Sequence, residues 1–120
     1  MPETEIILFA EDDGAVPLLA WLDKLPAKVQ DKCIVKIERL AAMGHELRRP
    51  EADYLRDGIY ELRVSLQGVR YRILYFFQGK RAVISHGLVK TSRVPPIEID
   101  LAVERKIGFA KNPVKHTHQG

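Results

Sequence analysis

Apolar and polar positions alternate through three consecutive segments in the second half of the chain. These segments are residues 59–66, 69–77 and 80–90, and they are rich in β-branched and aromatic residues. The two breaks between them are Gln-Gly pairs, Gln67-Gly68 and Gln78-Gly79. Because a period of two is typical of half-buried strands and short glycine-containing breaks favour tight hairpins, the pattern predicts a three-stranded antiparallel meander.

Helical spacing dominates the first half of the chain, after a short apolar run at residues 5–10 that favours a β-strand. Apolar residues recur every three or four positions in residues 17–25 and again in residues 26–44, which predicts two helices. Both segments begin with proline, which suits a first helical turn, and the second ends in glycine, which suits a helix end. Residues 45–58 are polar and predict an ordered connecting loop.

A last helix is predicted to begin at Pro95-Pro96, and residues 111–120 are expected to be a flexible tail. The element order is then β-α-α-β-β-β-α. This order predicts an α+β fold, an antiparallel β-meander sheet with its helices packed on one face. A length of 120 residues suits one compact core, so a single domain over residues 1–120 is expected.

The two predicted hairpins fix which residues face each other. With Gln67-Gly68 as a two-residue loop, Arg63 lies directly opposite Arg72. Two opposed arginines destabilise a sheet by a few tenths to ~1 kcal/mol unless an anion lies between them. A phosphate group would satisfy both guanidinium groups. The alternative is that Glu61 pairs with Arg63 on an otherwise solvated face.

Alternation sorts the strand residues into two faces. One face is expected to pack on the helices, and the other carries the arginines. The packed face contains Leu62, Val64, Leu66, Val69, Tyr71, Ile73, Tyr75, Phe77, Ala82, Ile84 and Leu88. The arginine face contains Glu61, Arg63, Ser65, Arg70, Arg72, Leu74, Phe76, Arg81, Val83 and Ser85, with Ser85 opposite Arg72.

The net charge of +3 is unevenly distributed along the chain. Residues 1–60 carry eight Lys/Arg and twelve Asp/Glu, whereas residues 61–120 carry eleven and four. Between residues 62 and 97 there are seven basic residues and no acidic one. Such a basic surface favours a phosphate-rich partner, RNA in particular, although it is also compatible with a merely soluble surface.

The histidines offer few candidates for acid–base chemistry. The same count along the strands places His86 on the packed face opposite Tyr71, where a hydrogen-bonded core residue is the favoured role. A β-bulge at Gly87 would shift the face of His86 relative to Lys90. His116 and His118 lack further ligands, so no metal site is expected.

The remaining composition narrows the class of protein. Cys33 is the single cysteine, so neither a disulfide nor a thiolate metal cluster forms within one chain. No signal peptide and no membrane span are expected, which predicts a cytoplasmic protein. Motifs for nucleotide hydrolysis, acyl transfer or metalloprotease chemistry are missing from the sequence, and no cofactor is expected.

Three motifs carry a resemblance to a known family: the segments DGIYELR at residues 57–63, RYRILY at residues 70–75 and HGLVK at residues 86–90. In this order and spacing they resemble the RelE/ParE toxin superfamily, and most of all its HigB-like, phage-derived host-inhibition branch. The likeness extends over nearly the whole chain, including the proline-started last helix.

The resemblance implies the toxin of a type II toxin–antitoxin pair, with a cognate antitoxin, the ribosome and mRNA as partners. Many relatives cut mRNA in the ribosomal A site without a metal ion. On this resemblance Arg63 and Arg72 hold the scissile phosphate and Lys90 supports the transition state or steers RNA. Further RNA-binding candidates are Arg70, Arg81 and Arg93, and the candidate acids or bases are His86, His116 and His118.

Two departures from the family pattern leave the chemistry open. Relatives tend to have Phe and a second Lys in the third motif, where this chain has Leu88 and Thr91. Several mRNA-cleaving relatives have a Tyr or His near the C-terminus, and here no tyrosine follows Tyr75. Two alternatives therefore stand beside the endoribonuclease: a non-enzymatic inhibitor that binds DNA gyrase, as in the ParE branch, and an inactive phage-derived relative.

Overall fold

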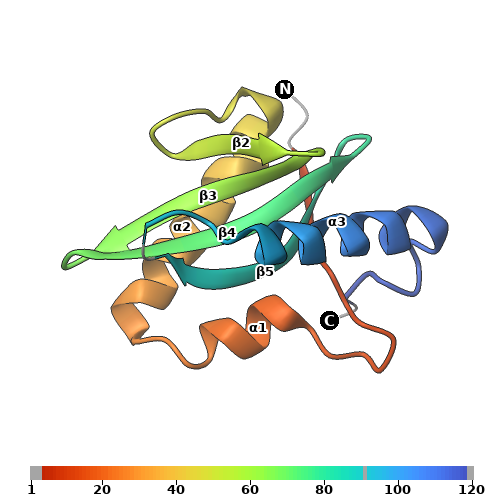
Figure 1. Ribbon diagram of the computed structural model, residues 1–120, viewed down its shortest axis with the longest axis horizontal. Coiled ribbons are helices and arrows are strands. Elements are labelled where there is room, and N and C mark those ends of the chain that lie inside the picture. The colour runs from red at the N-terminus through yellow and green to blue at the C-terminus, as the bar shows by residue number, and fades with distance from the viewer. Residues whose placement is uncertain (1–3, 91, 119–120) are drawn as a thin grey trace.

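The computed structural model describes residues 4–90 and 92–118 of the chain (Figure 1). It confirms the α+β class, with a five-stranded mixed sheet and three α-helices. Expectations for residues 1–3, for Thr91 and for residues 119–120 lie outside the described residues. The strands are β1 (Glu5–Leu8), β2 (Ala52–Arg56), β3 (Ile59–Leu66), β4 (Val69–Gln78) and β5 (Arg81–Lys90); the helices are α1 (Pro17–Leu22), α2 (Ala27–Met43) and α3 (Pro96–Lys111), with a short 3-10 turn, η1 (Gly44–Glu46).

The strands lie in the order β1-β5-β4-β3-β2, with the predicted meander of β3, β4 and β5 at the centre. β1 pairs with β5 in parallel, so the sheet is mixed rather than wholly antiparallel. The expectation of a loop throughout residues 45–58 is wrong, because β2 forms within this segment and pairs with β3. Asp57 and Gly58, with φ angles of 52° and 82°, close the two-residue hairpin between these strands.

The hairpin between β3 and β4 has the predicted register. Gln67 and Gly68 form its two-residue loop with φ angles of 51° and 81°, and Leu66 faces Val69. Counting from this loop, Arg63 pairs with Arg72, as predicted. The alternation of pairs in an antiparallel ladder makes this a non-hydrogen-bonded pair, in which opposed side chains approach most closely.

The register between β4 and β5 differs from the prediction. Gln78 faces Arg81, so the loop is one residue further along than predicted, and a bulge leaves Ser85 without a cross-strand partner. As a result Arg72 faces Leu88 rather than Ser85, and His86 faces Leu74 rather than Tyr71. The bulge also reverses the side on which the rest of β5 presents its side chains.

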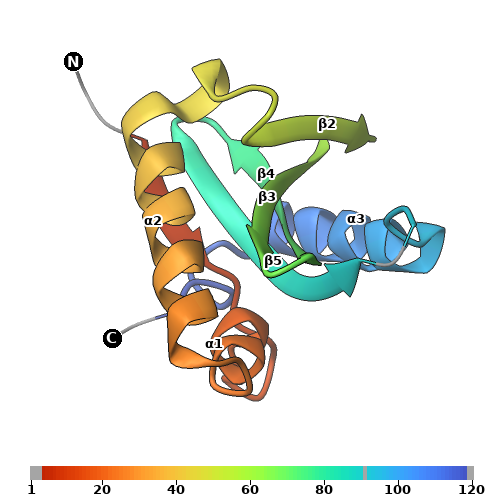
Figure 2. The same cartoon turned by 90° about the vertical axis from the view of Figure 1, so that its left-hand side faces the viewer.

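Helices cover both faces of the sheet, which corrects the expectation of helices on one face (Figure 2). The helices α1 and α2 pack on one face, and α3 packs on part of the other. The α3 core includes Leu74, Phe76 and Val83 of the predicted arginine face, together with Leu88, which was predicted on the packed face. Only the part of this face beyond α3 is left for the arginines.

Gly87 has a packing role, and the bulge considered at this position lies at Ser85 instead. A Cβ atom at this position would overlap the indole ring of Trp21 in α1. The Trp21 ring also lies edge-on to Tyr71, with 6.3 Å between centroids. The missing side chain therefore lets α1 lie directly against β5.

The C-terminal segment is packed in its described part, in contrast to the flexible tail expected for residues 111–120. Lys111 ends α3, and Thr117 makes an isolated antiparallel bridge with Phe9. The backbone N–H of Ala10 donates to His116 O at 2.9 Å, and that of His118 donates to Leu8 O at 3.0 Å. Within residues 4–90 and 92–118, none of the helices has the length and apolar character needed to cross a bilayer.

Candidate functional site

Arg63 and Arg72 lie side by side with the carboxylate of Glu61 between them. The Nε atom of Arg63 donates to Oε2 of Glu61 at 3.0 Å, and the Nε atom of Arg72 lies 3.2 Å from Oε1 of the same group. An anion between the two guanidinium groups was expected from the register. The anion is the carboxylate of Glu61, whose pairing with Arg63 was the alternative prediction from the sequence.

Two of these three side chains, Glu61 and Arg72, are buried. Glu61 is 2% exposed and Arg72 is 5% exposed, whereas Arg63 is half-buried. Burial lowers the pKa of Arg72, and the negative charge of Glu61 opposes that shift. The Nη1 group of Arg72 donates to Tyr71 O at 2.9 Å, but its Nε and the Oε1 of Glu61 are not aligned for a hydrogen bond. Arg72 thus depends on Glu61 for charge compensation.

Arg70 and Lys90 extend the positive charge toward the end of the sheet. They face each other across β4 and β5, and the bulge at Ser85 is what turns Lys90 onto the arginine face. Partial burial, followed by the positive charge of Arg72, lowers the pKa of Lys90. We refer to Arg63, Arg70, Arg72 and Lys90 as the basic cluster.

The strand missed in the sequence places a second carboxylate at this cluster. Asp53 in β2 accepts a hydrogen bond from Nη2 of Arg63 at 3.1 Å, and its carboxylate lies 3.0 Å from Nε of Arg49. The hydrogen bond with Arg49 is the largest influence that lowers the pKa of Asp53. Arg63 is therefore held between the carboxylates of Glu61 and Asp53.

A groove of about 690 Å³ runs beside the basic cluster, between α2 and the β3–β4 hairpin. Three arginines of the cluster contribute to it, together with residues of α2 and of the segment before β2. Its lining is Asp31, Lys32, Val35, Lys36, Pro50, Glu51, Arg63, Val64, Ser65, Arg70 and Arg72.

A comparison with models of protein families shows the family of this chain. The model of the phage-derived protein Gp49-like family (DUF891) matches residues 20–106, which is more than half of the chain. The chain belongs to the Gp49-like family. No curated protein matches it.

The Gp49-like proteins are a RelE-like toxin family, which agrees with the coarser part of the resemblance seen in the sequence. The matched range includes all four residues of the basic cluster and the whole of β2 to β5. It leaves out β1 and the segment after residue 106, including His116 and His118. The basic cluster therefore lies within the matched part of the chain.

The other two arginines proposed for RNA binding are not part of the cluster. Arg81 is at the opposite end of β5 from Lys90, a span of ~30 Å at the usual rise per strand residue. Its guanidinium lies over the ring of Phe109, 5.3 Å from the centroid. Arg93 is exposed in the connection between β5 and α3.

His86 of this Gp49-like protein is buried under α3, on the face opposite to the predicted one. Its Nδ1 lies 2.7 Å from Ser85 Oγ, and its Nε2 lies 2.9 Å from Oε1 of Glu98. Burial lowers the pKa of His86, although the hydrogen bond with Glu98 opposes this shift. Arg105 donates to Ser85 O at 3.3 Å and completes a buried polar network. The role of His86 in this network is structural.

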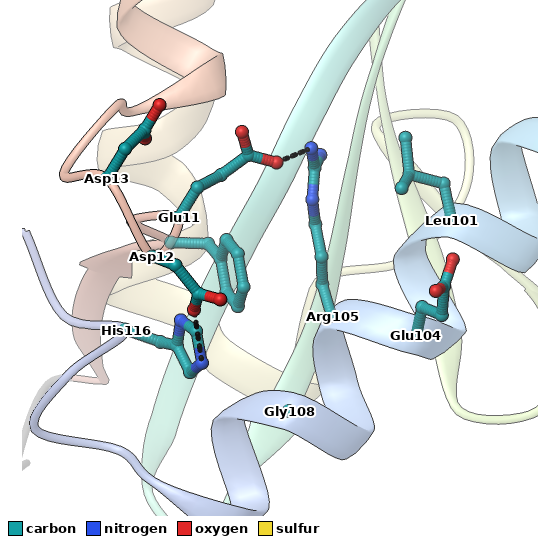
Figure 3. A pocket seen from close by; sticks show the side chains of 9 residues that line it. Glu11, Asp12, Asp13, Leu101, Glu104, Arg105, Gly108 and His116 are labelled. Atoms are coloured by element: carbon teal, nitrogen blue, oxygen red, sulfur yellow. Dashed lines mark hydrogen bonds and ion pairs between the residues drawn. The ribbon is translucent and has the colours of Figure 1, made fainter.

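His116 lies in a separate pocket of about 530 Å³, formed by α3, the turn after β1 and the C-terminal segment (Figure 3). Its ring stacks on Phe9 at 4.8 Å, its Nδ1 lies 2.8 Å from Ala10 O, and its Nε2 lies 3.8 Å from Oδ1 of Asp12. None of the residues lining this pocket belongs to the basic cluster or to the groove beside it. His118 is placed by its backbone bond to Leu8. The structure thus does not bring the three histidines to the arginine pair.

Proposed function

We propose that this protein is a HigB-like toxin of a toxin–antitoxin pair and cuts mRNA on the ribosome without a metal ion. The observation that carries the proposal is the pair of arginines, Arg63 and Arg72, converging on one anionic group in the basic cluster. A small antitoxin would neutralise it. This function requires the protein to be in the cytoplasm, where mRNA is translated.

In the proposed reaction the 2′-oxygen of one nucleotide attacks the adjacent phosphorus, and the bond from phosphorus to the 5′-oxygen breaks. The products are a 2′,3′-cyclic phosphate and a 5′-hydroxyl. Negative charge builds up on the phosphate oxygens, where the guanidinium groups of Arg63 and Arg72 stabilise it. Each guanidinium has five N–H donors, so Arg63 retains donors for a phosphate besides those it uses with Glu61 and Asp53.

One group of the basic cluster, Lys90, suits a proton transfer, and it is not a histidine. The carboxylate of Glu61 is 2% exposed and touches both arginines, so it orients them, and the proton of the 2′-hydroxyl passes to water. The ammonium of Lys90 has a lowered pKa and therefore releases a proton more readily than an ordinary lysine does. We assign it the proton that the departing 5′-oxygen takes up.

The test is to map transcript ends in cells that express the wild type or Arg63→Ala. Arg63 is chosen because it is half-buried, so its removal disturbs the fold less than removal of Arg72. Arg81→Ala is the matched control, since it removes an equal charge from the far end of the sheet. We expect new ends with the wild type and the control, and a loss of those ends with Arg63→Ala. Equal cutting by all three proteins would refute the assignment.

A second candidate is a ParE-like inhibitor that binds DNA gyrase and has no catalytic activity. The observation that favours it is the buried ion pair of Arg72 with Glu61, which leaves Arg72 only 5% exposed. A binding surface has no need of a proton-transfer group. Expression would then induce a DNA-damage response with intact mRNA, while an inactive relative would cause no growth defect.

A further inference from the structure

The groove beside the basic cluster has the size and charge of a site for one nucleotide. Its volume of about 690 Å³ lies within the ~300–1,000 Å³ typical of small-ligand pockets. Lys32, Lys36 and three arginines give it five cationic side chains, against two anionic ones, Asp31 and Glu51. Since Glu51 is already paired with Lys36 and Arg39, the lining attracts an anion.

The wall formed by β3 offers groups that could recognise a base. β2 begins opposite Leu62, and the backbone N–H of Arg63 donates to Glu51 O at 2.8 Å. Beyond this bond β3 has no neighbouring strand on that side within the described residues. Ser65 is two residues further, so its backbone N–H and C=O point to the same edge and into the groove that it lines.

The facing wall comes from α2 and combines an apolar side chain with a lysine. Val35 is 53% exposed, although the stripe of α2 formed by Val29, Cys33 and Leu40 is buried. Lys32 lies one turn before it on the same side of the helix. An apolar surface flanked by cations suits the flat face of a base and the phosphate attached to it.

We infer that this groove holds the nucleotide next to the phosphate gripped by Arg63 and Arg72, with Val35 and Ser65 contacting the base and Lys32 its phosphate. The inference depends on the proposed function and adds to it a determinant of sequence preference. The ligand is RNA in an extended, unpaired state, because the groove continues directly from the basic cluster through Arg70 and Arg72.

The test uses full-length protein on programmed ribosomes, with cut sites mapped for Val35→Trp and Lys32→Ala. Ile34→Trp and Lys28→Ala are the matched controls, since both residues are exposed on α2 and do not line the groove. We expect Val35→Trp to change the nucleotides at the cut sites and to lower kcat/KM by about tenfold. Lys32→Ala should weaken cutting at all sites and reduce its salt dependence.

The outcomes separate this inference from the proposed function. If the wild type cuts and the groove variants match their controls in site preference and in kcat/KM, the nucleotide site is wrong and the proposed function stands. If the wild type cuts no mRNA, both the proposed function and the nucleotide site are refuted. If Val35→Trp only abolishes neutralisation by the antitoxin and leaves cutting unchanged, the groove binds a protein and the inference is also overturned. Thermal unfolding of each variant shows that it is folded.

Discussion

The Nε atom of Arg72 lies 3.2 Å from Oε1 of Glu61, and both side chains are almost fully buried. This contact lies at the centre of the basic cluster, since Glu61 also binds Arg63. The removal of one charge from a buried ion pair leaves the other uncompensated, which is far more costly than replacing both. The contact therefore links the stability of the sheet to the charge of the site.

Glu61→Leu is expected to lower the free energy of unfolding by about 3 kcal/mol, because Arg72 keeps a buried charge without its partner. The double variant Glu61→Leu, Arg72→Met should recover much of this loss, since it removes both charges. Urea unfolding of the wild type, both single variants and the double variant gives the coupling energy. Additive losses in the two single variants would show that the pair is not coupled.

Lys90→Met is expected to reduce activity without reducing stability. The lowered pKa of Lys90 means that burial and the neighbouring Arg72 disfavour its charged form, so the loss of that charge should leave the free energy of unfolding equal or higher. Loss of one transition-state donor should lower mRNA cutting by about 10²- to 10³-fold. Lys80→Met, an exposed lysine in the turn before β5, is the control and should cut normally.

The carboxylate of Glu51 predicts a loss of stability in acid. Its hydrogen bond from Arg39, followed by that from Lys36, lowers its pKa to about 2 from an ordinary value of 4.5. A folded-state pKa below the unfolded one contributes stability that is present above pH ~4.5 and disappears as the pH falls through ~2. Urea unfolding from pH 6 to pH 2 should show a shallower decline for Glu51→Gln than for the wild type. Parallel declines would rule out this origin.

Gly87→Ala is expected to destabilise the protein by about 1–3 kcal/mol, because the added methyl group overlaps the ring of Trp21. The same substitution in a Trp21→Leu background should cost less, since the smaller side chain leaves room. Thermal and urea unfolding of the four proteins measure this coupling. An equal cost in both backgrounds would mean that the indole is not the obstacle.

The register of the arginine pair could be predicted because it depends only on a short, local signal. A two-residue loop at Gln67-Gly68 fixes every pair in β3 and β4, and residues at these two positions have the positive φ angles that the loop needs. The hairpin at Asp57-Gly58 carries a stronger signal of the same kind. The strand before it gives no clear signal, because residues 52–56 show little alternation, and the contribution of Asp53 is therefore not visible in the sequence.

The bulge at Ser85 could not be located from the sequence. An extra residue in a strand costs little locally, and its place is set by contacts from other elements, here Arg105 and Glu98 of α3. The second core under α3 did leave a signal, since Leu74, Phe76 and Val83 are apolar on a face expected to be polar. For Glu61, sequence spacing gave only the possible pairing with Arg63, and not its burial or its contact with Arg72.

One unpaired residue in β5 decides which surface receives Lys90. If Ser85 were instead paired with Leu74 in a regular ladder, β5 would run without interruption and every side chain after it would change sides. Lys90 would then turn toward the surface that α1 and α2 cover, and Val89 would replace it among the arginines. The charge distribution of this protein thus depends on one residue that the ladder leaves out, and an in-frame deletion of that residue is expected to leave Lys90 beside Arg70.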